Sequence, residues 1–299
     1  MKHSNNKILV WAACFYLITT LTTACKKDGN PNNLPDVSPA DYEGKIDGFN
    51  STEEIFPNNL VSYWSFDGTK NELKSGAAPT QTANDVLVAG GVRGQAVSLT
   101  AGYLYYATQL PQFKTDSLKS WSLSLWVKIK NNGSKRTMVF QNARPTLFNG
   151  NINVALNTQS YPATNDSVIR LQPTFASVNS ANGTTAMQDN LNSVIDKFNL
   201  NNWLHIVLTY DITTGTFNNW INAVKVGNFP NRGTVNIFKA WEPNEVIIGS
   251  NYNGIPGKAV NTDVTFAPMT GQLDEIRIWN MPLPDAYIRA VYNLGIAGK

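Results

Sequence analysis

From residue 58 onward, apolar and polar residues alternate along short segments that end in Gly, Asn, Asp or Pro. The clearest segment spans residues 121–129, in which Trp126 falls among Ser and Lys on one face. The opposite face carries Trp121, Leu123, Leu125, Val127 and Ile129. Because a period of two places alternate side chains on opposite sides of a strand, this segment predicts a strand with one buried face. The same pattern recurs in residues 60–66, 203–210, 219–226, 245–249 and 272–279.

Helical spacing is found near the C-terminus. Pro284 suits the first turn of a helix, and apolar residues follow at spacings of three and four as far as Tyr292. Many short strands and one late helix predict a single all-β domain over residues 58–296. We expect a two-sheet antiparallel sandwich with one short C-terminal helix. The stretch 161–202, rich in Asn, Ser and Thr, is expected to be an elaborated loop on it.

The first 24 residues are predicted to be a secretory signal rather than part of the fold. Lys2 and Lys7 give a basic start, an apolar stretch covers residues 8–21, and the small residue Ala24 precedes Cys25. This order is typical of a signal peptide. The apolar stretch is shorter than the roughly 20 residues that a membrane-spanning helix needs.

Residues 21–25 resemble the lipobox of bacterial lipoproteins. The resemblance implies that Cys25 is lipidated, becomes the mature N-terminus and anchors the protein to the outer membrane, with Lys26 compatible with that destination. Because Cys14 lies in the removed segment, Cys25 would be the one remaining thiol, and a lipid would explain why it is unpaired. The alternative is a soluble secreted protein in which Cys25 is incidental.

Residues 25–57 are predicted to be a flexible tether. Pro and Asn interrupt this segment and its apolar residues are isolated, so it cannot bury enough surface to offset the entropy of ordering. Removal of Lys2 and Lys7 would lower the formal net charge from +3 to +1. Without clustered Lys and Arg, a nucleic-acid partner is not expected, and membrane contact is expected through the lipid alone.

Five segments, taken together and in order, resemble the laminin-G-like, concanavalin A-like jelly-roll family. They are residues 60–68, 91–99, 121–127, 203–211 and 271–279. The C-terminal helix also fits the end of that family. The resemblance implies a jelly-roll sandwich, which agrees with the alternation pattern.

The resemblance also implies one structural calcium ion, because several members of the family hold calcium between their first and last strands. Asp67, after the opening strand, and Asp274, in the closing strand, would supply carboxylates. Calcium prefers six to eight oxygen ligands, and backbone carbonyls would complete the shell. The alternative is that Asp67 bonds its own turn and that Asp274 pairs with an arginine.

Related jelly rolls include glycoside hydrolases, which need two carboxylates close together. The Glu-x-Asp-x-x-Glu string of related enzymes does not occur in this sequence. Asp274 and Glu275 are adjacent and are expected to point to opposite faces of a strand, and Glu242 and Glu245 are expected to be split as well. His205 is expected to be a packed strand residue. We predict no catalytic residue, while an active site assembled from different strands stays open.

Glycan binding requires aromatic faces flanked by polar groups that bond hydroxyls. Trp241, Tyr252 and Tyr161 lie in turn-rich contexts, and Arg144 is placed to donate to hydroxyls or a uronate. Each of the four has the alternative of ordinary loop packing. The sequence therefore predicts a surface lipoprotein that takes part in the capture of polysaccharide or oligosaccharide. A module that binds a surface protein partner is the second hypothesis, and a glycoside hydrolase the third.

Overall fold

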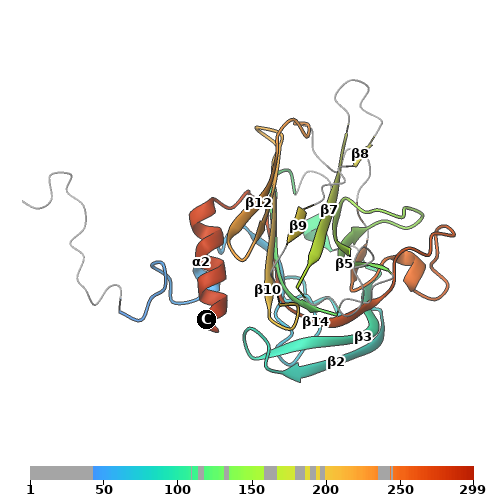
Figure 1. Cartoon of the computed structure of the whole chain (residues 1–299), viewed down its shortest axis with the longest axis horizontal. Coiled ribbons are helices and arrows are strands. Elements are labelled where there is room, and N and C mark those ends of the chain that lie inside the picture. Colours follow the sequence, from blue (N-terminus) through green and yellow to red (C-terminus); the bar gives the residue numbers. More distant parts are fainter. Residues whose placement is uncertain are drawn as a thin grey trace, which may run out of the picture. The chain divides into compact units, whose positions relative to one another are not determined.

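The computed structural model describes residues 43–108, 110–113, 118–130, 135–157, 167–178, 186–188, 193–195, 199–234, 243 and 245–299. Residues 44–299 form one compact unit. In the described part of this unit, fourteen strands join one curled sheet, and helix α2 follows the last strand (Figure 1). No helix of the described residues is long and apolar enough to cross a membrane.

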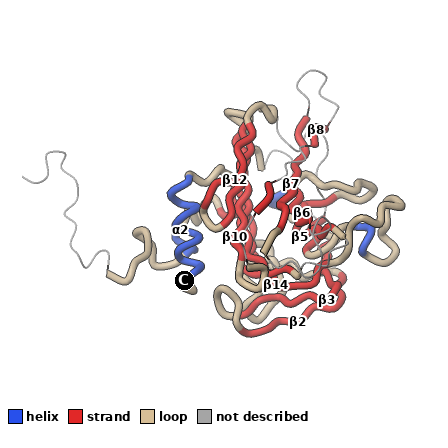
Figure 2. The backbone as a smooth tube through the Cα atoms, in the orientation of Figure 1, coloured by secondary structure: helices blue, strands red, loops and turns tan. Residues whose placement is uncertain are grey.

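The strands span 3 to 12 residues each, and loops connect them (Figure 2). They are β1 (Leu60–Trp64), β2 (Gln81–Ala89), β3 (Gln95–Tyr106), β4 (Trp121–Ile129), β5 (Arg136–Ala143), β6 (Ile152–Asn157), β7 (Ile169–Val178), β8 (Ala186–Gln188), β9 (Ser193–Ile195), β10 (Leu204–Asp211), β11 (Thr216–Ile221), β12 (Val224–Phe229), β13 (Glu245–Ile248) and β14 (Met269–Trp279). The helical segments are α2 (Asp285–Ile296) and the 3-10 turns η2 (Thr52–Glu54), η3 (Pro111–Phe113) and η5 (Tyr252–Gly254).

The sheet folds over on itself into two layers. Its order is β12-β11-β10-β4-β14-β3-β13-β5-β6-β7-β8, with β1 beside β14, β2 beside β3 and β9 beside β7. Strand β3 belongs to both layers, because Leu99 pairs with Gly271 of β14 whereas Leu104 pairs with Ile248 of β13. Figure 1 shows β10 and β12 on one side, β5 and β7 on the other, and β3 and β14 joining them below. The predicted all-β, two-sheet antiparallel sandwich of jelly-roll type is confirmed.

The core between the layers contains the apolar face that the alternation in β4 predicts. Trp121, Leu123, Leu125, Val127 and Ile129 are all buried there. Trp126 points the other way and is buried beneath α2, where its ring stacks on Tyr292 with 5.7 Å between centroids. Gly295 permits this contact, since a Cβ there would lie 2.4 Å from the Trp126 ring. The helix is confirmed, with Pro284 as its N-cap rather than in its first turn.

Residues 44–57 differ from the predicted tether, because they pack on the sandwich. Ile55 is 1% exposed and its carbonyl accepts a hydrogen bond of 3.0 Å from Trp279 Nε1. The Thr52 hydroxyl donates to the carbonyl of Lys299 at 2.6 Å. The folded unit therefore begins at Gly44 rather than at residue 58. The isolated apolar residues of this segment gave no periodic signal, because they join a cluster with residues of α2 and the end of β14 rather than lining one face of a regular element. The signal segment and Cys25 lie outside the described residues.

Candidate functional site

Two loops beside the β13-β5-β6-β7 layer enclose the hollows that best suit a small polar ligand. We call them the loop pair: residues 144–151, between β5 and β6, and residues 255–268, between η5 and β14. In Figure 1 the second loop extends beyond β5 at the right of the view. Both loops line each of two hollows, and each hollow has a volume of about 360 Å³. Segments far apart in the sequence thus form one region.

Buried amide side chains fix the shape of the first loop. Gln141 Nε2 donates to the carbonyl of Phe148 at 2.8 Å and to Asn153 Oδ1 at 2.9 Å. Asn153 closes the loop, because its Oδ1 accepts from Gly150 N and its Nδ2 donates to Gly150 O, both at 2.9 Å. Gly150 is required by close approach, since a Cβ there would lie 1.9 Å from Asn142 O. The loop is therefore ordered before any ligand arrives.

The second loop is held at two places. Asn253 Nδ2 donates to Asp263 O at 2.8 Å, and Asn253 Oδ1 accepts from Val260 N at 3.0 Å. Strand β13 ends opposite Phe140, so it does not pair with the first residues of β5. The second loop pairs there instead: Arg136 N donates to the carbonyl of Thr265 at 2.8 Å, and the Arg136 carbonyl accepts from Ala267 N at 2.9 Å. Phe266 is thereby set at the edge of β5.

The first hollow, here the phenylalanine hollow, combines aromatic rings with charged and polar groups. Phe148 and Phe266, each half-buried, meet edge to face with centroids 5.6 Å apart. The Arg136 guanidinium lies over the Phe266 ring at 5.6 Å. The other lining side chains are Met138, Asn149, Ala155, Gln172, Thr174 and Asp263. Rings of this kind stack on the C–H faces of sugars, while amides, hydroxyls and charges bond sugar hydroxyls.

Asp263 is an ionised acceptor at the rim of the phenylalanine hollow. The Thr265 hydroxyl and backbone amide donate to its Oδ1 at 2.6 and 2.7 Å. These hydrogen bonds lower the pKa of the Asp263 carboxyl, because they favour its charged form. Arg136 is close enough to lower this pKa further. The hollow thus offers both a fixed donor and a fixed acceptor.

The second hollow, here the tyrosine hollow, has a carboxylate near its floor. Glu245 is 8% exposed and accepts a hydrogen bond from the Tyr252 hydroxyl. Burial and the neighbouring Glu245 raise the pKa of Tyr252, so its hydroxyl keeps the proton and remains a donor. Lys258, on the second loop, places its ammonium 5.1 Å from the Tyr105 ring centroid. Pro145 and Thr146 of the first loop complete the wall.

Of the four predicted glycan contacts, the structure places Arg144 in the loop pair and Tyr252 in η5, directly before the second loop. Arg144 is exposed in the first loop. Tyr252 lines the tyrosine hollow, but its ring is 2% exposed and packs in the core with Tyr105 and Ile255. The prediction of an open stacking face at Tyr252 is therefore wrong. Trp241 and Tyr161 lie outside the described residues.

The sequence reasoning missed Phe148 and Phe266. Both had the signal used for the other aromatics, since Asn149 and Gly150 follow Phe148 and Pro268 closely follows Phe266. Their meeting could not be inferred, because it depends on how two distant loops cross β5. Arg136 carried no signal, because the alternation pattern predicted no strand in its segment.

The two carboxylates assigned to calcium both bind the turn 91–95. Asp67 Oδ1 accepts from Gln95 N at 2.7 Å. Asp274 Oδ2 accepts from the amides of Val92 and Arg93 at 2.7 and 3.2 Å, and its Oδ1 accepts from Glu275 N at 2.9 Å. Burial, with the nearby Glu275 carboxylate, raises the pKa of Asp274 to about 8. Among the described residues, no group of three or more His, Cys, Asp or Glu side chains is placed to hold a metal ion. This donor set fits a hydrogen-bonded turn rather than calcium.

Asp274 and Glu275 do not point to opposite faces, as strand alternation predicted. A β-bulge interrupts β14 between Asp274 and Arg277, and Glu275 has a φ of 52°. The bulge brings both carboxylates near Arg93, whose amide bonds Asp274 and whose Nε lies 3.6 Å from Glu275. Both are buried, and Glu275 also accepts from the Tyr63 hydroxyl at 2.9 Å. Neither lines the phenylalanine or the tyrosine hollow.

The comparisons with known proteins concern the fold. The family profile described as the concanavalin A-like lectin/glucanases superfamily matches residues 100–289. No curated protein sequence matches the chain. Among solved structures, the chain is similar to domain 4 of AbnA, a GH43 extracellular arabinanase from Geobacillus stearothermophilus, in complex with arabinotriose. The identity is 18%, the TM-score is 0.50, and the match covers 78% of this chain and 98% of that domain.

Toxin binding domains are similar as well. The binding domain of botulinum neurotoxin serotype D/C has a TM-score of 0.52 at 10% identity, over 80% of this chain and 52% of that one. The binding domain of Paraclostridial Mosquitocidal Protein 1 has a TM-score of 0.53 at 12% identity, over 79% and 52%. The chain thus spans about half the length of these toxin domains. At such identities the likeness shows the fold alone.

Proposed function

Because the chain belongs to the concanavalin A-like lectin/glucanases superfamily, we propose that it is a non-catalytic protein that binds oligosaccharide in the phenylalanine hollow. One observation carries this proposal: Phe148 and Phe266 meet over the hollow while Arg136 lies on the Phe266 ring. An aromatic wall beside a fixed donor and a fixed acceptor is the combination that sugar recognition requires.

The order of the loop pair supports binding rather than simple packing. Immobilising a flexible loop costs free energy that is subtracted from the affinity. Here Asn153 and Asn253 already hold the two loops through hydrogen bonds to backbone groups. A ligand therefore binds to loops that are already ordered, and little of the binding free energy is lost in immobilising them.

The relatives suggest which sugars to test first. Domain 4 of AbnA was solved with arabinotriose, and this chain matches 98% of that domain. Arabinotriose and longer arabinan oligomers are therefore the first ligands to try, followed by other plant and host oligosaccharides.

We also propose that Cys25 carries a lipid that anchors the protein to the outer membrane and displays the domain at the cell surface. The order of basic, apolar and small residues before Cys25 supports this proposal. With the folded unit beginning at Gly44, a tether would be confined to residues 26–43.

Isothermal titration of the full chain with arabinotriose and the other oligosaccharides tests the sugar site. We expect Phe266→Ala to weaken binding by about tenfold or more, as loss of a central aromatic contact does. Phe229→Ala is the matched control, because Phe229 is also half-buried and carries the guanidinium of Arg232 at 5.8 Å. Failure of every sugar to bind the folded protein, or equal binding by Phe266→Ala and the wild type, would overturn the proposal.

A protein partner is the second candidate function. The botulinum neurotoxin DC binding domain, to which this chain is also similar, was solved in complex with rat synaptotagmin II. Recovery of a defined surface protein by the full chain, unaffected by competing sugar and by Phe266→Ala, would favour this function. Turnover of the same oligosaccharides would instead favour a glycoside hydrolase.

A further inference from the structure

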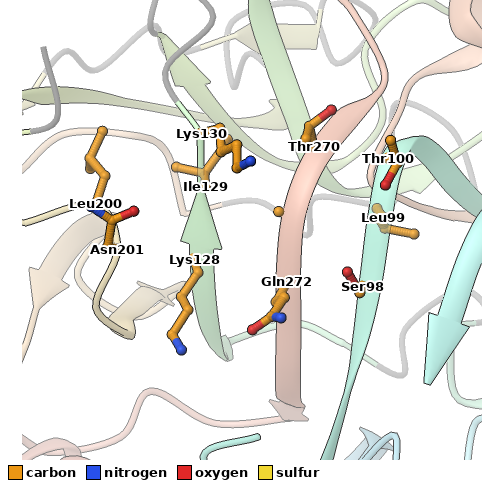
Figure 3. A pocket seen from close by; sticks show the side chains of 11 residues that line it. Ser98, Leu99, Thr100, Lys128, Ile129, Lys130, Leu200, Asn201, Thr270 and Gln272 are labelled. Atoms are coloured by element: carbon orange, nitrogen blue, oxygen red, sulfur yellow. The ribbon is translucent and has the colours of Figure 1, made fainter. Parts of the chain in front are cut away.

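A third hollow, of about 330 Å³, lies over strands β3, β14 and β4. We call it the lysine hollow. Two rows of polar residues cross these strands in register: Gln272 pairs with both Ser98 and Lys128, and Thr270 pairs with Thr100. Lys130 extends the second row, since its N donates to the carbonyl of Thr270 at 3.1 Å. Figure 3 shows these side chains from the three strands, with Asn201 on a neighbouring loop.

The lysine hollow is a part of the sheet that core packing leaves free. Val97 and Leu273 lie in the core, whereas the polar residues next to them, Ser98 and Gln272, are partly exposed. Helix α2 covers the sheet elsewhere, at Trp126 and Trp279. Gly271, at the centre of the hollow, carries no side chain, and none would fit there because a Cβ would lie 2.1 Å from Lys128 O. The result is an open polar surface rather than a packed one.

The charged residues among the described residues that line the lysine hollow are Lys128 and Lys130, and none of these described lining residues is acidic. In the part of the chain that the structure describes, neither Lys128 nor Lys130 has a carboxylate within ion-pair distance. The ammonium of Lys128 lies 4.8 Å from the Trp203 ring centroid, which positions it without neutralising it. Two uncompensated cations surrounded by hydroxyl and amide groups complement a ligand that is both anionic and hydroxylated.

We infer that the lysine hollow binds the carboxylate group of an acidic polysaccharide, with uronate residues held by Lys128 and Lys130. A uronate carries its carboxylate and several hydroxyls on one rigid ring, which matches ammonium, hydroxyl and amide groups set side by side. Adjacent strands are about 4.8 Å apart, so each row offers successive contacts to an extended chain.

A lipid headgroup fits the lysine hollow less well. A protein that binds an anionic membrane surface usually has exposed apolar side chains beside its basic residues, and these side chains enter the acyl region. The large apolar side chains exposed in the described residues are Leu73, Val86, Val224, Val264 and Ile296, and none of them lines this hollow. Among the residues that the structure describes, the lysine hollow also shares no lining residue with the phenylalanine hollow, so either site can exist without the other.

The test is titration of the full chain with oligogalacturonate and with the same oligomer methyl-esterified, which removes the charge and keeps the sugar. We expect the free acid to bind, to bind more weakly as salt is raised, and to lose about tenfold or more in affinity in Lys128→Gln/Lys130→Gln. Lys74→Gln/Lys119→Gln is the control, because it removes the same charge at two exposed lysines outside the hollow.

Two further variants separate binding from folding and from the sugar site. Lys128→Arg/Lys130→Arg keeps both charges, so it should bind at least about threefold more tightly than the glutamine variant and keep the salt dependence of the wild type. Phe266→Ala should bind oligogalacturonate as the wild type does. Equal binding by the glutamine variant and the wild type, or equal binding of the ester and the acid, would overturn the inference. Lysine-dependent binding to vesicles containing phosphatidylglycerol, without binding of oligogalacturonate, would assign the hollow to a membrane surface instead.

Discussion

Asp67 and Asp274 accept hydrogen bonds from backbone amides at opposite ends of one turn, residues 91–95. Glycines let the turn approach them: a Cβ at Gly94 would lie 2.1 Å from Asp67 Oδ1, and one at Gly91 would lie 2.7 Å from Asp274 Oδ2. The carboxylates thus join the opening and closing strands to the turn before β3. A hydrogen-bonded turn performs here the bridging task that the family resemblance assigned to calcium.

Calcium is accordingly expected to leave stability unchanged. A site saturated at a hundred times its dissociation constant would add about 2.7 kcal/mol to the free energy of unfolding. We expect the thermal midpoint in EDTA and in millimolar calcium to agree within about 1 °C, well below the shift that such a gain produces. Magnesium serves as the control for ionic strength. A saturable rise with calcium that Asp67→Asn abolishes would show that the turn also binds the ion.

Glu53 is expected to secure the N-terminal segment to the sandwich. Its Oε1 lies 2.5 Å from Arg93 Nη2 and 3.2 Å from Arg277 Nη2, and Arg277 is 2% exposed. Burial opposes ionisation of Glu53, but the two arginines prevail and hold its pKa at about 2. Glu53→Gln should lower the free energy of unfolding by about 0.5–1.5 kcal/mol, because the Glu53 side chain is 42% exposed, so that solvent screens its ion pairs, and because Glu275 still pairs with Arg277.

Urea unfolding measures this effect, and limited proteolysis reports where it acts. Glu53→Gln should be cut sooner within residues 44–56. Glu54→Gln is the control, because Glu54 is exposed and its carboxylate accepts hydrogen bonds from Asn50 of its own segment. Equal stability and equal cleavage of the Glu53 variant and the wild type would mean that apolar contacts alone hold the segment.

Local alternation predicted six segments of the sandwich, because it is a property of each strand. It did not predict β2, β5 or β6, and the stretch 161–202, which was expected to be a loop, contains β7, β8 and β9. The opposite faces of β4 follow from the period of two, and both Leu125 and Trp126 lie where that period places them. The segment 44–57 has no such period, since Ile55 and Thr52 bury against partners more than two hundred residues away. A pattern within one segment cannot reveal a surface supplied by another.

The site was less predictable for the same reason. Turn-rich aromatics marked the right kind of residue, and Arg144 indicated one of the two loops. The pairing of Phe148 with Phe266 depends on how residues 255–268 bond to the open start of β5, which only the three-dimensional arrangement specifies. The bulge at Glu275 likewise overrode the alternation that separated it from Asp274.

Lipidation at Cys25 can be tested directly in cells. Cys25→Ser should abolish incorporation of labelled fatty acid and shift the protein from the membrane fraction to the soluble fraction. Cys14→Ser is the control, since Cys14 lies inside the predicted signal and should leave both readouts unchanged. Labelling that survives Cys25→Ser would mean that the lipobox resemblance is fortuitous.

His205 is expected to make the protein less stable in acid. It is fully buried, its Nε2 lies 2.8 Å from Ser124 Oγ, and burial lowers its pKa to about 3, with a smaller contribution from Arg277. Between pH 6.5 and 3 this histidine is protonated in the unfolded chain and neutral in the folded protein. The free energy of unfolding therefore falls as the pH falls, by up to about 1.4 kcal/mol per pH unit from this group.

Comparison with His205→Asn isolates that contribution. The substitution lowers stability at every pH through lost packing, but its difference from the wild type should shrink steadily from pH 7 to pH 4. Urea unfolding at four pH values measures the difference. A constant difference across that range would mean that His205 takes up its proton at the same pH in the folded protein as in the unfolded chain.

Asn153 is expected to govern sugar affinity without touching the sugar. It is absent from the lining of the phenylalanine hollow, yet it bonds Gly150 through both its amide atoms and accepts from Gln141. Asn153→Ala leaves these buried groups without their partner, which should lower the free energy of unfolding by about 1–3 kcal/mol. Because the freed loop must then be ordered on binding, arabinotriose affinity should fall by roughly threefold to tenfold.

Titration calorimetry should show the loss in the entropy of binding, with the enthalpy maintained. Asn293→Ala is the control, since Asn293 bonds Asp47 beside α2 at 2.8 Å and should change neither quantity. A variant that loses stability and keeps full affinity would mean that the order of this loop contributes nothing to recognition.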